Sequence, residues 1–182
     1  MLKVTELGFK EVYLIVPNYF SDSRGYSYEP YVKKELEQNN IKNDFIQEYH
    51  SYSAKKGTLR GIHFQVAPFS QAKIVRCIYG HIFDVVVDLR KNSSTYKKWC
   101  AIELSAENRK QIYIPHGFGH AFLTLSDNCE VLYKMDQYYN ADASRNIRWN
   151  DPDINIIWPI ENPILSIADA HAPYINDSDV NF

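Results

Sequence analysis

The sequence predicts an all-β protein, a sandwich or jelly-roll barrel with short peripheral helices. Short segments rich in Val, Ile, Tyr and Phe recur along the chain, and polar or glycine-containing turns separate them. The 182 residues include 14 Tyr and 9 Phe, and aromatic residues favour strands. The length suits one domain over residues 1–182, since no repeat, low-complexity tract or Pro/Ser-rich linker marks a boundary.

Ten segments are expected to be strands because each combines strand-forming residues with a turn signal at its end. In chain order they are Glu11–Val16, Tyr26–Tyr31, Asn43–Tyr52, Thr58–Gln65, Ala72–Tyr79, His81–Leu89, Lys98–Leu104, Gln111–Ile114, Gly119–Leu125 and Cys129–Tyr138. Only Pro30–Asn39 has the pattern of a helix, and it is brief. A second short helix is expected in the less regular tail after Trp158.

The alternation of side chains predicts ionisable groups inside the barrel. In Cys129–Tyr138 one face carries the apolar residues Cys129, Val131, Tyr133 and Met135, so Tyr133 on that face should point inward. In His81–Leu89 the same reasoning makes Asp84 a candidate interior carboxylate, although both faces of that strand are rather apolar. A small barrel holds either side chains or one ligand, and inward ionisable groups favour a ligand cavity.

Composition excludes several functional classes. A formal net charge of −2 is not that of a nucleic-acid-binding domain or of a polybasic membrane anchor. No apolar run approaches the roughly 18 residues of a membrane span, and the N-terminus does not resemble a signal peptide. The three cysteines form no Cys-x-x-Cys pair, which indicates reduced thiols. These features predict a cytoplasmic protein with no nucleic-acid or membrane partner.

The densest group of reactive side chains lies between Gly57 and Gln65. A lone strand histidine is more often structural than catalytic, but Arg60 beside His63 is costly to bury without a function. Strict alternation would place Arg60 and His63 on opposite faces. A bulge at Gly61 would bring both into one cavity.

Two histidines four residues apart, His116 and His120, form a second group. This spacing binds zinc on a helix, but Pro115, Gly117 and Gly119 make a helix improbable. Metal binding is therefore the weaker interpretation, and a turn histidine with a half-buried one is the alternative.

Lys73 has two interpretations of about equal weight. It lies in a predicted strand, three positions before Arg76, so the two side chains should face opposite sides. Lys73 is either a solvent-exposed lysine or a cation in the cavity.

Motifs along nearly the whole chain resemble those of the dTDP-4-dehydrorhamnose 3,5-epimerases and their relatives, a cupin-like family of nucleotide-sugar epimerases. The motifs are Asp22–Gly25, Gly57–Gln65, Gln71–Lys73, Phe83–Arg90, Leu104–Arg109, Ile114–Phe122, Tyr133–Lys134, Ile147–Pro152, Trp158–Pro159 and Pro163–Ser166. The resemblance implies a cupin-like jelly roll, usually a homodimer with strands shared across the interface. It also implies no metal and no redox cofactor.

The resemblance implies roles for individual residues. His63 matches the general base, Asp169 the carboxylate that orients it, and Tyr133 the proton donor on the opposite face. Lys73 matches the lysine beside the substrate carbonyl. The positions that contact the nucleotide sugar are Arg24, Glu29, Gln47, Arg60 and His120.

Three departures from the family pattern bear on the substrate. Glu48 and Tyr49 stand where the family usually has Asp-Asn, Ser144 where an acidic residue precedes the arginine, and Ile167-Ala168 where Glu-Lys is frequent. All three lie where the family contacts the nucleotide sugar. Tyr49 offers a ring that can stack on a base or line a wider sugar pocket.

The departures favour a GDP-linked 4-keto-heptose as the substrate, in the synthesis of a sugar for a cell-surface polysaccharide. The alternative is the dTDP-4-dehydrorhamnose of the rhamnose pathway.

Two further hypotheses compete with epimerisation. A metal-dependent cupin needs about three clustered ligands, and the sequence has no His-x-His pair. A sugar-binding module without catalysis would not need His63, Tyr133 and Asp169 together.

Overall fold

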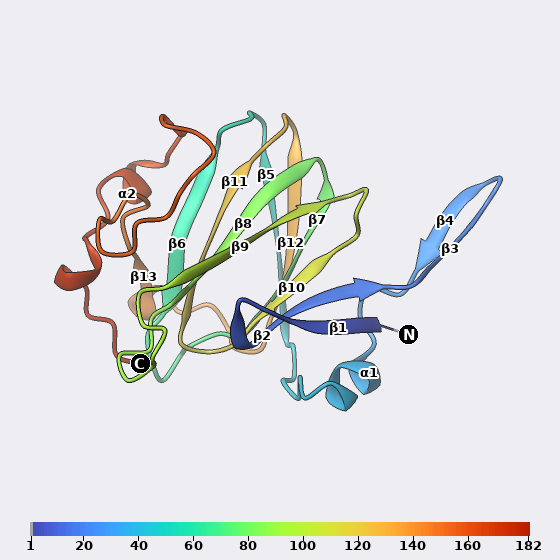
Figure 1. Ribbon diagram of the computed structural model, residues 1–182, viewed down its shortest axis with the longest axis horizontal. Coiled ribbons are helices and arrows are strands. Elements are labelled where there is room, and N and C mark those ends of the chain that lie inside the picture. Colours follow the sequence, from blue (N-terminus) through green and yellow to red (C-terminus); the bar gives the residue numbers. More distant parts are fainter. Residues whose placement is uncertain (1) are drawn as a thin grey trace.

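Two antiparallel sheets face each other in the computed structural model, which describes residues 2–182 (Figure 1). The larger sheet has the order β1 (Leu2–Leu7), β2 (Phe9–Pro17), β10 (Gln111–Ile114), β7 (Lys73–Tyr79), β12 (Cys129–Met135) and β5 (Gln47–Ser53). The smaller has the order β13 (Ser144–Asn146), β6 (Leu59–Gln65), β11 (Phe118–Thr124), β8 (His81–Asp88) and β9 (Trp99–Ser105). This confirms the predicted all-β, cupin-like jelly roll.

A hairpin of β3 (Tyr19–Asp22) and β4 (Gly25–Tyr28) projects away from the two sheets, at the upper right of Figure 1. The helices are short, as expected: α1 covers Lys33–Gln38 and α2 covers Ile167–Ala170. Single 3₁₀ turns occur at Ala141–Ala143 and Ile175–Asp177. Among residues 2–182, no helix is long and apolar enough to cross a membrane.

Three strands, β1, β3 and β13, were not expected from the sequence. The first and last are edge strands, and all four residues of β3 are exposed. Such strands bury little side-chain surface and therefore show a weak apolar pattern; pairing with a neighbour decides their conformation. The expected strand over Cys129–Tyr138 ends early, at Met135. Asp136, the next residue, instead accepts hydrogen bonds from Asn43 and the backbone N–H of Ala72.

The main core lies between the two sheets. Val75 and Val131 of the larger sheet pack with Ile82 and Phe122 of the smaller one. Tyr133 belongs to this core and is 9% exposed, so the prediction that it points inward is confirmed.

The outer face of each sheet is also covered. Leu36 of α1 and Ile41, just after it, lie in one cluster with Ile15 and Ile74 on the larger sheet. On the smaller sheet the C-terminal segment packs its apolar residues, Ile147, Ile154, Ile175 and Val180, against Val85 and Val87 of β8. Strand β8 is therefore buried on both faces, which explains why both faces of its sequence are apolar.

Candidate active site

A cavity of about 590 Å³ contains most of the side chains that the sequence singled out. Its walls include residues from both sheets and from the segment around α2. Eight of the ten predicted site residues line it: Gln47, Tyr49, Arg60, His63, Lys73, His120, Tyr133 and Asp169. The volume is in the range of small-molecule sites.

A bulge in β6 brings Arg60 and His63 to the same cavity. His63 pairs with His120 and Arg60 with Phe122, so three steps along β6 match two steps along β11. The extra residue lies at Gly61–Ile62, and Ile62 turns outward into the second core cluster. This confirms the bulge predicted at Gly61.

His63 and Asp169 form a hydrogen-bonded pair. Nε2 of His63 lies 2.6 Å from Oδ1 of Asp169, whose side chain is buried. Burial alone would raise the pKa of Asp169, but the hydrogen bond and charge of His63, together with the Ser166 hydroxyl, bring it below the ordinary value. The ionised carboxylate accepts the Nε2 proton, which leaves Nδ1 of His63 as the basic nitrogen.

Tyr133 is held within the cavity wall by two aromatic rings. Its ring centroid lies 5.7 Å from that of His120 and 5.7 Å from that of Tyr49. Burial raises the pKa of Tyr133 well above its ordinary value, and the nearby charge of Asp84 raises it further. The hydroxyl therefore keeps its proton at neutral pH and is chemically an acid.

A second histidine–carboxylate pair lies behind the cavity wall, with His120 lining the cavity and Asp84 buried beneath it. Nε2 of His120 is 2.8 Å from Oδ2 of Asp84, and both side chains are buried. Oδ1 of Asp84 has no hydrogen-bond partner among residues 2–182. Burial raises the pKa of Asp84, although His120 opposes this. The interior position predicted for Asp84 is confirmed.

Lys73 belongs to the cavity and not to the open surface, which decides between its two interpretations. Desolvation lowers the pKa of Lys73 to about 8, although the charge of Asp84 counteracts part of this. Arg76 lies on the opposite side of β7, as the alternation predicted. At neutral pH Lys73 is still mostly protonated, so a cation faces the cavity.

The two histidines at zinc-like spacing do not share a site. His116 bonds to Asp136 at 2.8 Å, outside the cavity, whereas His120 bonds to Asp84. His120 was expected to be half-buried, but it is buried. Its strand, β11, lies inside the sheet between β6 and β8. Over residues 2–182 no three His, Cys, Asp or Glu side chains cluster in a way that would hold a metal ion.

Two predicted substrate-binding residues, Arg24 and Glu29, do not line this cavity. Arg24 lies in the turn of the projecting hairpin and pairs with Asp22, and its side chain is 88% exposed. Glu29 follows the hairpin and lies in a separate depression with Ser27 and Val32. Arg24 lies in the turn of the hairpin that projects away from the two sheets (Figure 1), and Glu29 comes directly after its second strand.

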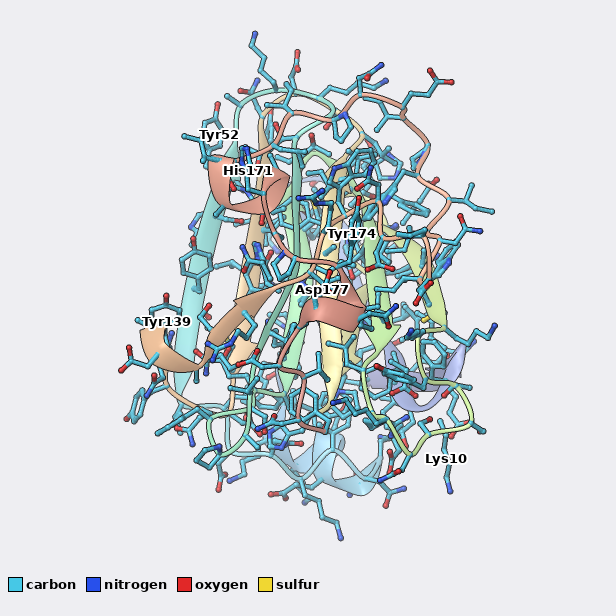
Figure 2. The ribbon with its side chains drawn as sticks, turned by 90° about the vertical axis from the view of Figure 1, so that its left-hand side faces the viewer. Lys10, Tyr52, Tyr139, His171, Tyr174 and Asp177 are labelled. Atoms are coloured by element: carbon cyan, nitrogen blue, oxygen red, sulfur yellow. The ribbon has the colours of Figure 1, made fainter. Side chains whose placement is uncertain are left out.

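Several cavity residues were not singled out from the sequence. Ser166 caps α2 and donates to Oδ2 of Asp169, and Asn146 donates to Oδ1. The Ser-x-x-Asp spacing of a helix cap was the available signal for Ser166. Tyr139 also lines the cavity and reaches the molecular surface (Figure 2), but it lies in a loop whose position no periodicity predicts.

Comparison with known proteins bears on this arrangement. The family model of dTDP-4-dehydrorhamnose 3,5-epimerase matches residues 6–177. The chain belongs to this family. A dTDP-4-dehydrorhamnose 3,5-epimerase of Shigella flexneri is 42% identical over 179 residues, which are 98% of both chains. Nucleotide-sugar 3,5-epimerases are isomerases, and the chain is an enzyme of that class.

Solved structures agree with the fold of this epimerase. The Bacillus anthracis dTDP-4-dehydrorhamnose 3,5-epimerase with TDP and pyrophosphate bound has a TM-score of 0.94 and 44% identity, over 96% of this chain and 99% of that one. The Legionella pneumophila epimerase in complex with dTDP-4-keto-L-rhamnose has a TM-score of 0.94 and 36% identity, over 98% and 95% of the two chains.

Proposed function

We propose that this epimerase inverts C3 and C5 of a dTDP-linked 4-keto-6-deoxyhexose, as in the rhamnose pathway. The observation that carries the proposal is the presence of a base, an acid and a cation in one cavity: His63, Tyr133 and Lys73. The C4 ketone acidifies the protons on C3 and C5, because the charge left on carbon moves to the carbonyl oxygen.

His63 is the proposed general base. Its Nδ1 accepts the proton from C3 or C5, and the C–H electron pair becomes the double bond of an enolate. Asp169, 2.6 Å from Nε2, fixes the tautomer and stabilises the imidazolium that forms. An imidazole suits this step because its ordinary pKa lies near neutrality.

Tyr133 is the proposed acid on the other face of the sugar. Its high pKa keeps the hydroxyl protonated until the carbanion forms, and proton transfer from Oη to carbon then completes the inversion. The tyrosinate and the imidazolium return to their starting states by exchanging protons with solvent.

Lys73 is the proposed electrostatic group. Its ammonium stabilises the negative charge on the enolate oxygen, and stabilisation of this kind often lowers the activation barrier more than any other single effect. The reaction moves protons only, so it consumes no redox cofactor. We propose that Gln47, Arg60 and His120 hold the nucleotide sugar, since all three line the same cavity.

The proposed dTDP-linked substrate differs from the GDP-linked 4-keto-heptose that the sequence favoured. The similar proteins described above are dTDP-4-dehydrorhamnose epimerases, and two of their structures hold TDP or a dTDP-sugar. One observation favours the heptose as a second candidate: Tyr49, Ser144 and Ala168, which replace the usual residues, all line the cavity. The GDP-linked substrate therefore stays a prediction to be tested beside the dTDP-linked one.

We propose that the active unit is a homodimer in the cytoplasm. The projecting hairpin exposes Phe20, which is 77% accessible, and carries Arg24 away from its own cavity. A second copy can receive this hairpin at its cavity, which would bring Arg24 and Glu29 to the substrate. Cys77, Cys100 and Cys129 are unpaired, which suits a reducing compartment.

The test is NMR of dTDP-4-keto-6-deoxyglucose and of GDP-linked 4-keto-heptoses incubated with the enzyme in deuterated water. We expect deuterium at C3 and C5 of the dTDP-hexose, with a higher kcat/KM than for the heptoses. His63→Asn should abolish the exchange while the protein stays folded. A binding module would catalyse no exchange with either substrate, and a preference for the heptose would reverse the substrate proposal.

A further inference from the structure

Tyr49 stands directly opposite the proposed acid. In the pairing of β5 with β12, Tyr49 and Tyr133 occupy the same register position, and their side chains lie on the cavity side of the sheet. Their ring centroids are 5.7 Å apart at an interplanar angle of 52°. This is the separation at which aromatic pairs attract each other.

The two tyrosines differ in exposure. Tyr133 is 9% exposed, whereas Tyr49 is 54% exposed because β5 is the edge strand of its sheet. Tyr49 therefore contributes little to the core, and the fold does not depend on burying it. Its ring contact with Tyr133 is the interaction that would change if the ring were removed.

Inversion depends on where the Tyr133 hydroxyl lies. After His63 has taken a proton, the enolate can receive one on either face. A proton from Tyr133 arrives on the face opposite His63 and inverts the carbon. If the Tyr133 ring moves, the imidazolium of His63 returns a proton, or a deuteron gained from solvent, to the original face. When the imidazolium returns a deuteron, the carbon exchanges its hydrogen without inversion, and when it returns the original proton the substrate is unchanged.

We infer that Tyr49 is a positioning residue that holds the ring of Tyr133 in place. The enolate then receives its proton from Tyr133, with inversion, rather than from His63 on the original face. This inference rests on the proposed function, because it assigns the acid role to Tyr133. Tyr49 acts from the open side of the cavity, and His120 contacts the same ring from within the fold. The hydroxyl of Tyr49 is not needed for this role, only its ring.

The experiment compares Tyr49→Leu, Tyr49→Phe and wild type in deuterated water with dTDP-4-keto-6-deoxyglucose. The ratio of deuterium exchange to inversion is measured at each carbon. Loss of an aromatic pair corresponds to about a threefold to tenfold change in an equilibrium. In Tyr49→Leu we expect the ratio of inversion to exchange to fall about threefold to tenfold, whatever the change in the overall rate. Tyr49→Phe keeps the ring and should restore the wild-type ratio.

Tyr52→Leu is the matched control. Tyr52 lies on the same strand, has the same 54% exposure and sits at the periphery of the molecule in Figure 2. It is not among the residues that line the cavity. Its hydroxyl bonds to Asn128 and not to a site residue. This variant should keep the wild-type ratio, so a change there would indicate a general effect of altering β5.

The failure of the inference and the failure of the proposed function have different signatures. If wild type shows neither exchange nor inversion with either nucleotide sugar, the proposed function fails. If wild type inverts the sugar and Tyr49→Leu has the same ratio, the positioning role is wrong. Tyr49→Thr, a second ring-free variant suited to a strand, gives the same test should Tyr49→Leu fold poorly.

Discussion

Replacing Asp169 by Asn isolates the charge of the carboxylate from its hydrogen bonds. Oδ1 accepts from His63 at 2.6 Å and from Asn146 at 3.3 Å, while Oδ2 accepts from the Ser166 hydroxyl at 2.9 Å. An asparagine has nearly the same volume. Its oxygen can take the place of Oδ1, and its NH₂ can donate to Ser166, since a hydroxyl is also an acceptor. Asp169→Asn should therefore keep His63 in its tautomer and remove one negative charge.

The size of the effect follows from the imidazolium that forms during catalysis. Two unit charges about 4 Å apart attract by about 4 kcal/mol at an effective dielectric constant near 20. That corresponds to about 10³-fold in rate, which is the upper limit because the charge is only partly developed in the transition state. The side chain of His63 is 41% exposed, so water screens part of the attraction. We expect kcat to fall about 10²-fold, with little change in KM.

The assay is NMR of C3 and C5 inversion for Asp169→Asn beside a matched carboxylate-to-amide variant. Asp153→Asn serves as this control because Asp153 pairs with Lys97 away from the cavity, and its activity should stay within about twofold of wild type. Far-UV circular dichroism and the melting temperature check that both variants fold. An Asp169→Asn enzyme that keeps its fold and at least a third of the wild-type kcat would refute the assigned role of the charge.

Three other predictions test the cation, the bulge and the absence of a metal. If protonated Lys73 stabilises the enolate, kcat should decline as the pH rises through about 8, where Lys73 loses its proton. A kcat that is constant to pH 10 contradicts this. Lys73→Arg keeps its charge at high pH and should not show the alkaline decline. Gly61→Ala should lower the unfolding free energy by about 2–6 kcal/mol in urea titrations. At Gly61, whose φ is +123°, a Cβ would lie 2.5 Å from the Cβ of Ala121. Gly25 is the control because its φ is +127° but no atom lies within 4 Å of an added Cβ. An equal loss of stability in Gly25→Ala would exclude packing as the cause. Activity should persist after EDTA treatment, and a loss that zinc, iron or manganese restores would establish a metal-assisted mechanism.

Much of the site was predictable because strand alternation is a local property. Tyr133 and Asp84 were placed inside the barrel from their neighbours in sequence, and both are buried. The glycine between Arg60 and Ile62 indicated a bulge before the pairing of β6 was known. The resemblance to the epimerases, which depends on motif order, added Asp169 as the partner of His63.

Other features lay beyond the sequence because they depend on which strands become neighbours. Nothing in the sequence paired His120 with Asp84, 36 positions away, or His116 with Asp136. The edge strands β1 and β13 have weak apolar patterns, so their pairing partners decide their conformation. Arg24 and Glu29 match the family in sequence, yet neither lines the cavity of their own chain, since Arg24 lies in the projecting hairpin and Glu29 directly after it.

The sequence by itself determined the fold class, the inward position of Tyr133 and Asp84, and the types of reactive group available. These follow from side-chain alternation, turn residues and motif order, which are all properties of the sequence itself. Only the tertiary structure decided which of those groups meet. Burial and partner charge depend on contacts between distant strands, and they raise the pKa of Tyr133, lower that of Asp169 and bring that of Lys73 down to about 8. The same side chains on isolated strands would have ordinary pKa values and no common cavity.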